Sequence, residues 1–193
     1  AFKKLGVEQI IAPCAVGSLK PKIKPGDFVI SDQFINWTKK REDTFFDGPK
    51  VAHISSADPF CPVLRNLAIK TCKNLKIPVH SKGTIIVIEG PRFSSRAESK
   101  FFSSLADVIN MTAYPEIVLA RELEMCYVNI ALVTDYDVGL ENKKGIKPVS
   151  AKEVVEIFKQ NNEKLKKALF EIIELMQEKR DCSCSKALEE AFI

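Results

Sequence analysis

Stretches with the periodicity of strands alternate with stretches that have the periodicity of helices along this 193-residue chain, and this alternation limits the fold more than any other feature. The run Thr84–Ile88 contains only β-branched residues, which is typical of a strand buried on both faces. Further strands are predicted at Glu8–Ala12, Asp27–Ser31, Asp107–Met111 and Cys126–Thr134. Strands that alternate with helices predict an α/β sheet covered by helices on both faces.

Helices are predicted between these strands from apolar spacing and from capping sequences. Apolar residues recur on one face from Leu64 to Leu75, and Glu116–Leu123 indicates a second helix. Capping boxes at Ser95–Glu98 and Ser150–Glu153 begin two more, the first ending near Leu105 and the second long and amphipathic. The sequence therefore predicts one α/β domain over residues 1–176.

The C-terminal residues 177–193 are predicted to form a tail rather than part of the domain. A polar stretch leads to Cys182-Ser183-Cys184 and then to a short closing helix that holds Leu188 and Phe192. Two interpretations of the cysteine pair stay open. It is either a pair of thiols in a mobile tail or a redox-active or locking disulfide, as occurs inside hyperthermophiles.

The composition excludes several classes of protein. The net charge of +4 comes from scattered lysines, which gives little support for nucleic-acid binding. The longest apolar runs, such as Ile85–Ile88, are too short for a membrane span, and no secretory leader opens the chain, so we expect a cytoplasmic protein. Six cysteines without C-x-x-C spacing and only two histidines predict no metal site.

Two aspartates follow the predicted strand that ends at Thr134. Ligands collect outside the carboxyl ends of strands in open α/β sheets, and Asp135 and Asp137 stand at i and i+2 there. On an extended chain both side chains point to the same side, where they suit a ligand with two adjacent donors, such as an amine and a protonated ring nitrogen. The alternative is that one aspartate caps the next segment and the other is solvated.

Two other strand ends carry polar or small residues. The segment 89–95 contains Glu89, Arg92 and Phe93 in one turn before a helix. The ring of Phe93 either stacks on a base or sugar or packs as a hydrophobic staple against the start of the helix. The segment Pro13–Ser18 is predicted as a turn of small residues whose backbone N–H groups hold an anion.

These motifs together resemble the methylthioadenosine phosphorylase branch of the purine nucleoside phosphorylase family, from Gly6 to about Leu175. The matching runs are AVGSL (15–19), EGPRFSSRAES (89–99), DVINMT (107–112), the Pro-Glu of 115–116 and TDYD (134–137). The resemblance implies a single α/β domain with a mixed, partly barrel-like central sheet flanked by helices, assembled as trimers or hexamers. It also implies phosphorolysis of 5′-methylthioadenosine to adenine and 5-methylthioribose-1-phosphate, with phosphate as co-substrate and no metal or organic cofactor.

The resemblance assigns the base and sugar to residues of these motifs. Asp135 is expected to act as general acid at the purine N7 and N6 side, and Asp137 to hold the amine. Burial near Asp137 is expected to raise the pKa of Asp135. The other residues expected at the base and ribose are Phe93, Ser94, Asn110, Met111 and Tyr136.

The remaining roles concern the two ends of the substrate. Thr112, with the Cys14–Ala15 turn, is expected to bind phosphate. The 5′-methylthio group is expected against three residues at the start of the long helix, namely Ala151, Val154 and Val155. His53 is expected to reach into the neighbouring subunit's site, although a packed or solvated imidazole is the alternative.

The sequence departs from the family at the phosphate side. Relatives carry Ser or Thr where this chain has Cys14, and a thiol is a poorer donor. The family's glycine-rich phosphate loop does not occur, and Ala1–Leu5 with Gly6 indicates the end of a helix, so we expect an N-terminal part to be missing.

Two alternative functions stay open. One is a phosphorylase for the 6-oxopurine nucleosides inosine and guanosine, although Ser94 and Asp135 stand where those relatives have glutamate and asparagine. The other is an inactive nucleoside-binding subunit.

Overall fold

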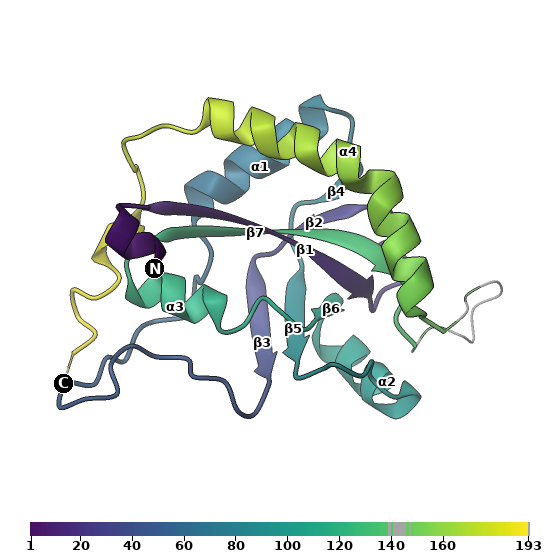
Figure 1. Cartoon of the computed structure of the whole chain (residues 1–193), viewed down its shortest axis with the longest axis horizontal. Coiled ribbons are helices and arrows are strands. Elements are labelled where there is room, and N and C mark those ends of the chain that lie inside the picture. The colour runs from purple at the N-terminus through teal and green to yellow at the C-terminus, as the bar shows by residue number, and fades with distance from the viewer. Residues whose placement is uncertain (139, 141–145, 147, 193) are drawn as a thin grey trace.

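A seven-stranded mixed sheet forms the centre of the molecule, which is a computed structural model that describes residues 1–138, 140, 146 and 148–192 (Figure 1). Its strand order is β3-β5-β6-β1-β7-β2-β4. The strands are β1 (Gln9–Ser18), β2 (Phe28–Ile30), β3 (Gln33–Trp37), β4 (Val79–His80), β5 (Thr84–Ile88), β6 (Val108–Asn110) and β7 (Cys126–Asp135). The helices are η1 (Phe2–Leu5), α1 (Pro62–Asn74), α2 (Arg96–Leu105), α3 (Glu116–Glu122), α4 (Ala151–Leu175) and η2 (Ser183–Lys186).

The two long strands β1 and β7 run parallel and form the longest pairing in the sheet. Gln9 lies opposite Cys126 and Val16 opposite Val133, and a shift then brings Gly17 opposite Asp135. Both β6 and β2 are antiparallel to these strands, so the sheet is mixed. Every residue of β7 is buried, as expected of a strand covered on both faces.

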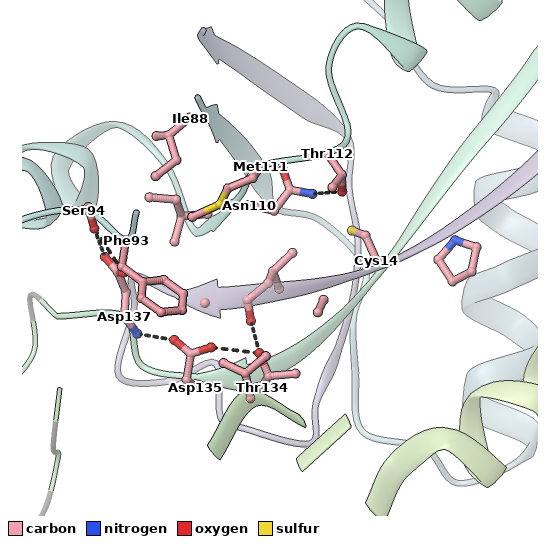
Figure 2. Close-up of a pocket in the computed structure, with 16 residues that line it drawn as sticks. Cys14, Ile88, Phe93, Ser94, Asn110, Met111, Thr112, Thr134, Asp135 and Asp137 are labelled. Atoms are coloured by element: carbon pink, nitrogen blue, oxygen red, sulfur yellow. Dashed lines mark hydrogen bonds between the residues drawn. The ribbon is translucent and has the colours of Figure 1, made fainter. Parts of the chain in front are cut away.

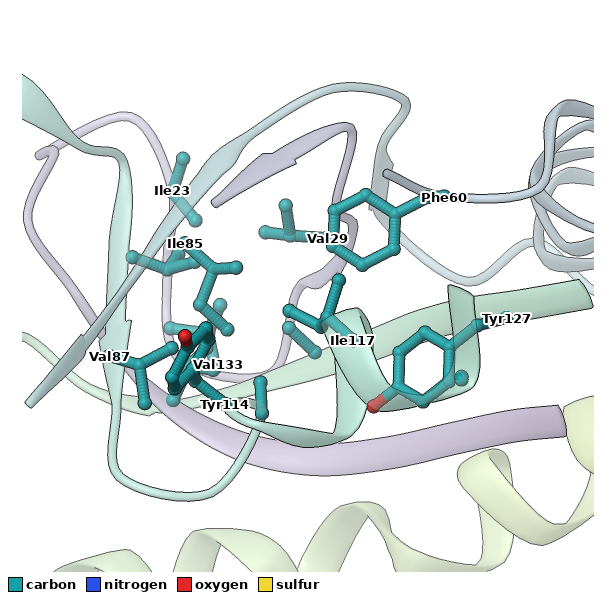
Figure 3. Packing of buried hydrophobic residues seen from close by; sticks show 14 of the residues in the cluster. Ile23, Val29, Phe60, Ile85, Val87, Tyr114, Ile117, Tyr127 and Val133 are labelled. Atoms are coloured by element: carbon teal, nitrogen blue, oxygen red, sulfur yellow. The ribbon is translucent and has the colours of Figure 1, made fainter. Parts of the chain in front are cut away.

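Helices cover the two faces of the sheet and form separate apolar layers (Figure 1). On one face, α1 and α4 pack through Leu64 and Leu165 against Ile130 and Leu132 of β7. On the other face, Ile117 of α3 packs in a cluster with Phe60, Tyr127 and, from β5, Ile85 and Val87 (Figure 3). The predicted α/β class with a mixed sheet flanked by helices is confirmed.

The predicted helices and strands are mostly found, and the capping sequences explain where helices begin. The Ser95 hydroxyl accepts from the Glu98 N–H at 3.2 Å and the Glu98 carboxylate accepts from the Ser95 N–H at 2.7 Å, which completes the capping box. Ser150 likewise accepts from the Glu153 N–H at the start of α4. None of the helices described is both long and apolar enough to cross a bilayer.

Two local predictions are wrong, and two strands were missed. Residues 13–18 are the second half of β1, not a turn, because they pair with β7. The strands β3 and β4 were not predicted, since β4 has only two residues and β3 is half polar. Finally, Leu188 and Phe192 are not helical: the only helix described in the tail is η2, and Phe192 forms an isolated bridge with Ala52.

Candidate active site

A cavity of about 250 Å³ opens where β7 ends, between β1 and the segments that follow β5 and β6 (Figure 2). It is lined by sixteen described residues: Pro13, Cys14, Ala15, Val16, Gly17, Ile88, Phe93, Ser94, Ile109, Asn110, Met111, Thr112, Thr134, Asp135, Asp137 and Val154. Three polar segments that the sequence analysis singled out, 13–18, 89–95 and 134–137, thus meet in one cavity.

Asp135, the last residue of β7, is held in a buried position at this cavity. Its carboxylate accepts from the Thr134 hydroxyl at 2.8 Å and from the Asp137 N–H at 2.8 Å. Burial raises the pKa of Asp135 to about 6, and the charges of Asp137 and Glu153 add to this, while the two hydrogen bonds oppose it. The predicted upward shift of the pKa is confirmed, and burial rather than the neighbouring aspartate is its main cause.

Asp137 reaches the cavity by a different route from the one predicted. The strand ends at Asp135, and Asp137 adopts a φ of 35°, so the two residues do not share an extended chain. The Asp137 carboxylate is buried and accepts from the hydroxyls of Ser94, at 2.8 Å, and Ser99 (Figure 2 shows the Ser94 bonds). A turn therefore brings the second carboxylate to α2, where serine hydroxyls fix it.

The wall beside these carboxylates is apolar. Phe93 lies in the loop between β5 and α2, and its ring faces the cavity with 41% of the residue exposed (Figure 2). Ile88, Met111 and Val154 complete this side. A half-exposed ring over an apolar wall suits a flat heterocycle that covers the ring when bound.

The opposite end of the cavity carries small uncharged polar groups. Asn110 Nδ2 donates to Thr112 Oγ1 at 3.3 Å, and the buried Asn110 Oδ1 has no hydrogen-bond partner within the described residues. Cys14 Sγ accepts from Asn129 Nδ2 at 3.2 Å, and burial raises the pKa of Cys14 to about 11, so this thiol stays protonated at neutral pH. None of the sixteen lining residues is a lysine, arginine or histidine.

Four predicted site residues lie outside the cavity lining. Tyr136, between the two aspartates, is not a lining residue, and neither are Ala151 and Val155, which lie near Val154 on the exposed start of α4. His53 lies at a separate cavity of about 430 Å³, and its backbone N–H donates to the Ala191 carbonyl. The expectation for His53 concerns a neighbouring subunit and stays a prediction.

The structure also adds residues that sequence reasoning did not select. A Cβ on Gly17 would lie 2.9 Å from Asp135 Oδ1 and 3.2 Å from Ile109 Cγ2, so only glycine leaves room for the carboxylate. Thr134 and Ser99 position the two aspartates. The signal for all three was present, because each stands inside one of the motifs AVGSL, TDYD and EGPRFSSRAES.

Comparison with known proteins agrees with this arrangement. A family model described as the phosphorylase superfamily matches residues 1–174. The chain is 59% identical to the S-methyl-5′-thioadenosine phosphorylase of Pyrococcus abyssi and 55% identical to that of Thermofilum pendens, over all of this chain and 73% and 72% of those proteins.

Solved structures give the same result. A methylthioadenosine phosphorylase from an antarctic soil metagenomic library is similar with a TM-score of 0.91 and 39% identity, over 100% of this chain and 68% of that one. A methylthioadenosine phosphorylase from Schistosoma mansoni in complex with adenine is similar with a TM-score of 0.88 and 33% identity, over 97% and 72% of the two chains.

Proposed function

This chain belongs to the S-methyl-5′-thioadenosine phosphorylases of the phosphorylase superfamily, and we propose that it cleaves 5′-methylthioadenosine with phosphate to adenine and 5-methylthioribose-1-phosphate. The observation that carries the proposal is the buried Asp135, with a pKa raised to about 6, in one cavity with Asp137 and Phe93.

The leaving base decides the role of Asp135. As the bond to C1′ breaks, adenine gathers negative charge, and a proton delivered toward N7 lowers the barrier. A carboxyl group with a pKa near 6 carries this proton in a useful fraction of molecules near neutral pH. Asp135 is therefore the general acid of the proposal.

Asp137 and the ring of Phe93 hold the base in place. The Asp137 carboxylate accepts from two serine hydroxyls and keeps capacity to accept from the 6-amino group. Phe93 and Ser94 line the base, Asn110 lines the base pocket, and the Met111 backbone holds the ribose hydroxyls in this assignment.

Val154 supplies the apolar contact for the 5′-methylthio group. It reaches the cavity from the first turn of α4, with Ala151 and Val155 beside it on the same helix. We keep these two as further contacts of the 5′ group, and Tyr136 as a contact of the base, although none of the three lines the cavity as it stands.

Phosphate is proposed to bind at the uncharged end, with Thr112, Cys14 and Ala15. The Thr112 hydroxyl is a donor there, and the protonated Cys14 thiol is a weaker one. Because the sixteen lining residues carry no cationic side chain, the phosphate charge must be balanced by groups outside this set. The curated relatives are longer than this chain, which spans 73% of the first of them.

The proposal also covers the surroundings of the enzyme. Nucleoside and phosphate are its small-molecule partners, without a metal or organic cofactor. We propose a homo-oligomer, trimer or hexamer, in which His53 serves the site of the next subunit. A cytoplasmic location, without nucleic-acid or membrane partners, is part of the same proposal.

The two alternatives receive less support. The Asp137 carboxylate repels the 6-oxo group of inosine and accepts from the 6-amino group of adenine, so selectivity favours adenine nucleosides. An inactive nucleoside-binding subunit has no need of an acid tuned by burial.

Replacement of Asp135 tests the proposal in the full-length protein. Asp135→Asn keeps the shape but removes the acid, and we expect kcat for phosphate-dependent adenine release to fall about 10²–10⁴-fold. Asp47→Asn, at an exposed position outside the cavity, is the control and should keep full activity. Near-normal kcat in Asp135→Asn would refute the role of this residue, and kcat/KM values for methylthioadenosine and inosine would decide the substrate class.

A further inference from the structure

Asn129 is a buried amide on a largely apolar face of β7. It is 1% exposed and stands between Tyr127 and Ala131, which both belong to the apolar cluster that contains Ile117 of α3. Side chains alternate between the two faces of a strand, so Asn129 points into the same layer. Burial of an amide is costly unless its polar atoms are hydrogen-bonded, so the partners of this side chain decide its role.

Two neighbours hold the Asn129 amide in one orientation. Its Nδ2 donates to the Ala12 carbonyl oxygen at 3.2 Å, and its Oδ1 accepts from the Ser31 hydroxyl at 2.8 Å. A carbonyl oxygen can only accept, so the amide atom that faces Ala12 must be the nitrogen. If the amide turned over, two acceptors would face each other, and this orientation is therefore fixed.

The same nitrogen donates to the sulfur of Cys14, two residues beyond Ala12 on β1, at 3.2 Å. The Cys14 thiol is protonated at neutral pH, because burial raises its pKa to about 11. A thiol has one proton, and its sulfur is a weak acceptor. Since Asn129 occupies the sulfur as an acceptor, the thiol proton must point in another direction. Figure 2 shows the sulfur on the side of Cys14 that faces Thr112 and Asn110, within the cavity.

This end of the cavity has hydrogen-bonding capacity left for a ligand. Asn110 is only 7% exposed, and its Oδ1 has no partner within the part of the chain that the structure describes. Buried polar atoms are normally hydrogen-bonded, so such an atom indicates that a bound group completes the site. Thr112 Oγ1 accepts from Asn110 Nδ2, which leaves the hydroxyl proton to be donated. Two donors, the O–H of Thr112 and the S–H of Cys14, suit an anion with several acceptor oxygens.

We propose that Asn129 is a positioning residue for phosphate, which turns the thiol proton of Cys14 into the cavity toward a phosphate oxygen. Ser31 and the Ala12 carbonyl fix the amide for this task. This role rests on the proposed function, in which Cys14 binds phosphate, and it adds residues that do not touch the substrate. A proton that already points at the ligand loses less freedom on binding, which helps a weak donor to serve where a hydroxyl would be stronger.

The phosphate affinity of the full-length protein tests the role of Asn129. Titration calorimetry with inorganic phosphate gives Kd, and initial rates give separate KM values for phosphate and for methylthioadenosine. In Asn129→Ala, Kd and KM for phosphate should rise about 3–10-fold, as for the loss of one hydrogen bond, while KM for methylthioadenosine stays unchanged. Asn161→Ala is the matched control. It removes another buried amide, which donates to the Ile157 carbonyl within α4, and it should leave the phosphate affinity unchanged.

A double-mutant cycle separates positioning from general packing. If Asn129 acts through the thiol, Cys14→Ala should weaken phosphate binding to a similar extent, and Asn129→Ala should add nothing to the loss in the Cys14→Ala background. Ser31→Ala should have a smaller effect, because the Ala12 carbonyl still orients the amide. In infrared difference spectra, the S–H stretching band of Cys14 should shift when phosphate is added, and it should shift less in Asn129→Ala. The same cycle with Ser31→Ala serves if the Asn129 variant is too unstable to purify.

Three results would overturn this role. They are an unchanged Kd for phosphate in Asn129→Ala, losses that multiply in the double variant, and a Cys14 S–H band that does not respond to phosphate. Calorimetry and infrared spectra do not depend on turnover, so the two proposals can fail separately. A protein that binds phosphate in this pattern but releases no adenine from methylthioadenosine contradicts the proposed phosphorolysis alone. Normal phosphorolysis with unchanged phosphate affinity in Asn129→Ala contradicts the role of Asn129 alone.

Discussion

The strand β7 carries an ionisable residue at each end, and the two ends differ in how their clusters are built. Cys126 begins the strand, where its sulfur and those of Cys61, Cys182 and Cys184 all lie within 4.8 Å of one another, and Asp135 ends the strand at the active-site cavity. With a rise of about 3.3 Å per residue the two positions lie about 30 Å apart. The aspartates are set by neighbouring strand ends and short turns, while the cysteines depend on a distant tail.

This difference between the two ends of β7 indicates where a substitution should affect activity and where it should affect stability. At the Asp135 end, hydroxyls of Thr134, Ser94 and Ser99 hold the carboxylates, so small local changes should alter activity more than stability. At the Cys126 end, cysteines from segments that are far apart in the chain pack together, so a substitution there should alter stability more than activity.

The largest test of this contrast, after the loss of Asp135 itself, is Gly17→Val. Any Cβ here lies 2.9 Å from Asp135 Oδ1, and a valine must displace the carboxylate. A misplacement of about 1 Å costs about 10²-fold, so kcat should fall by roughly that factor. Gly48→Ala, where a Cβ meets nothing within 4 Å, should leave kcat unchanged. Full activity in Gly17→Val would show that the carboxylate tolerates movement.

The next largest effect is a gain in stability in Asp135→Asn, the same variant that is expected to lose activity. The folded-state pKa of Asp135, about 6, lies above the value in the unfolded chain, so the folded state binds the proton more tightly. Protonation of Asp135 therefore stabilises the folded state at low pH, and this stabilisation is lost as the pH rises through about 6. Two pKa units correspond to about 3 kcal/mol at most.

Chemical denaturation over a pH series measures this effect. At pH 8 the asparagine variant should be more stable than wild type by about 1–3 kcal/mol, with the gap closing toward pH 4. A gap that does not vary with pH would mean that Asp135 is not the group that titrates.

Ser99→Ala should have the smallest effect. It removes one of two serine donors to the buried Asp137, and a hydrogen bond to a charged group contributes about 1.5–3 kcal/mol. We expect kcat/KM for methylthioadenosine to fall about tenfold or more, and Ser99→Thr to recover part of it. Ser104→Ala, at an exposed position of α2, is the control. Equal losses in both serine variants would point to a general effect on the helix.

The site was predictable where its residues stand in contiguous motifs. Asp135, Ser94 and Thr112 were selected from short runs, and each lines the cavity. Ser99 and Gly17 lie in the same runs but were not selected, because their roles depend on distances to Asp137 and Asp135 that periodicity does not contain. The path of Asp137 was wrong for a similar reason, since a φ of 35° is decided by the turn and not by the strand pattern.

The sequence by itself determined the alternation of strands and helices, the start of α2 at its capping box, and the identity of the polar strand ends, because these depend on residues within a few positions of one another. The tertiary structure alone decided that Cys61, Cys126 and the tail cysteines meet, and that burial tunes Asp135. Residues more than fifty positions apart are brought together by packing, and the dielectric environment of a carboxylate exists only once the core has closed around it.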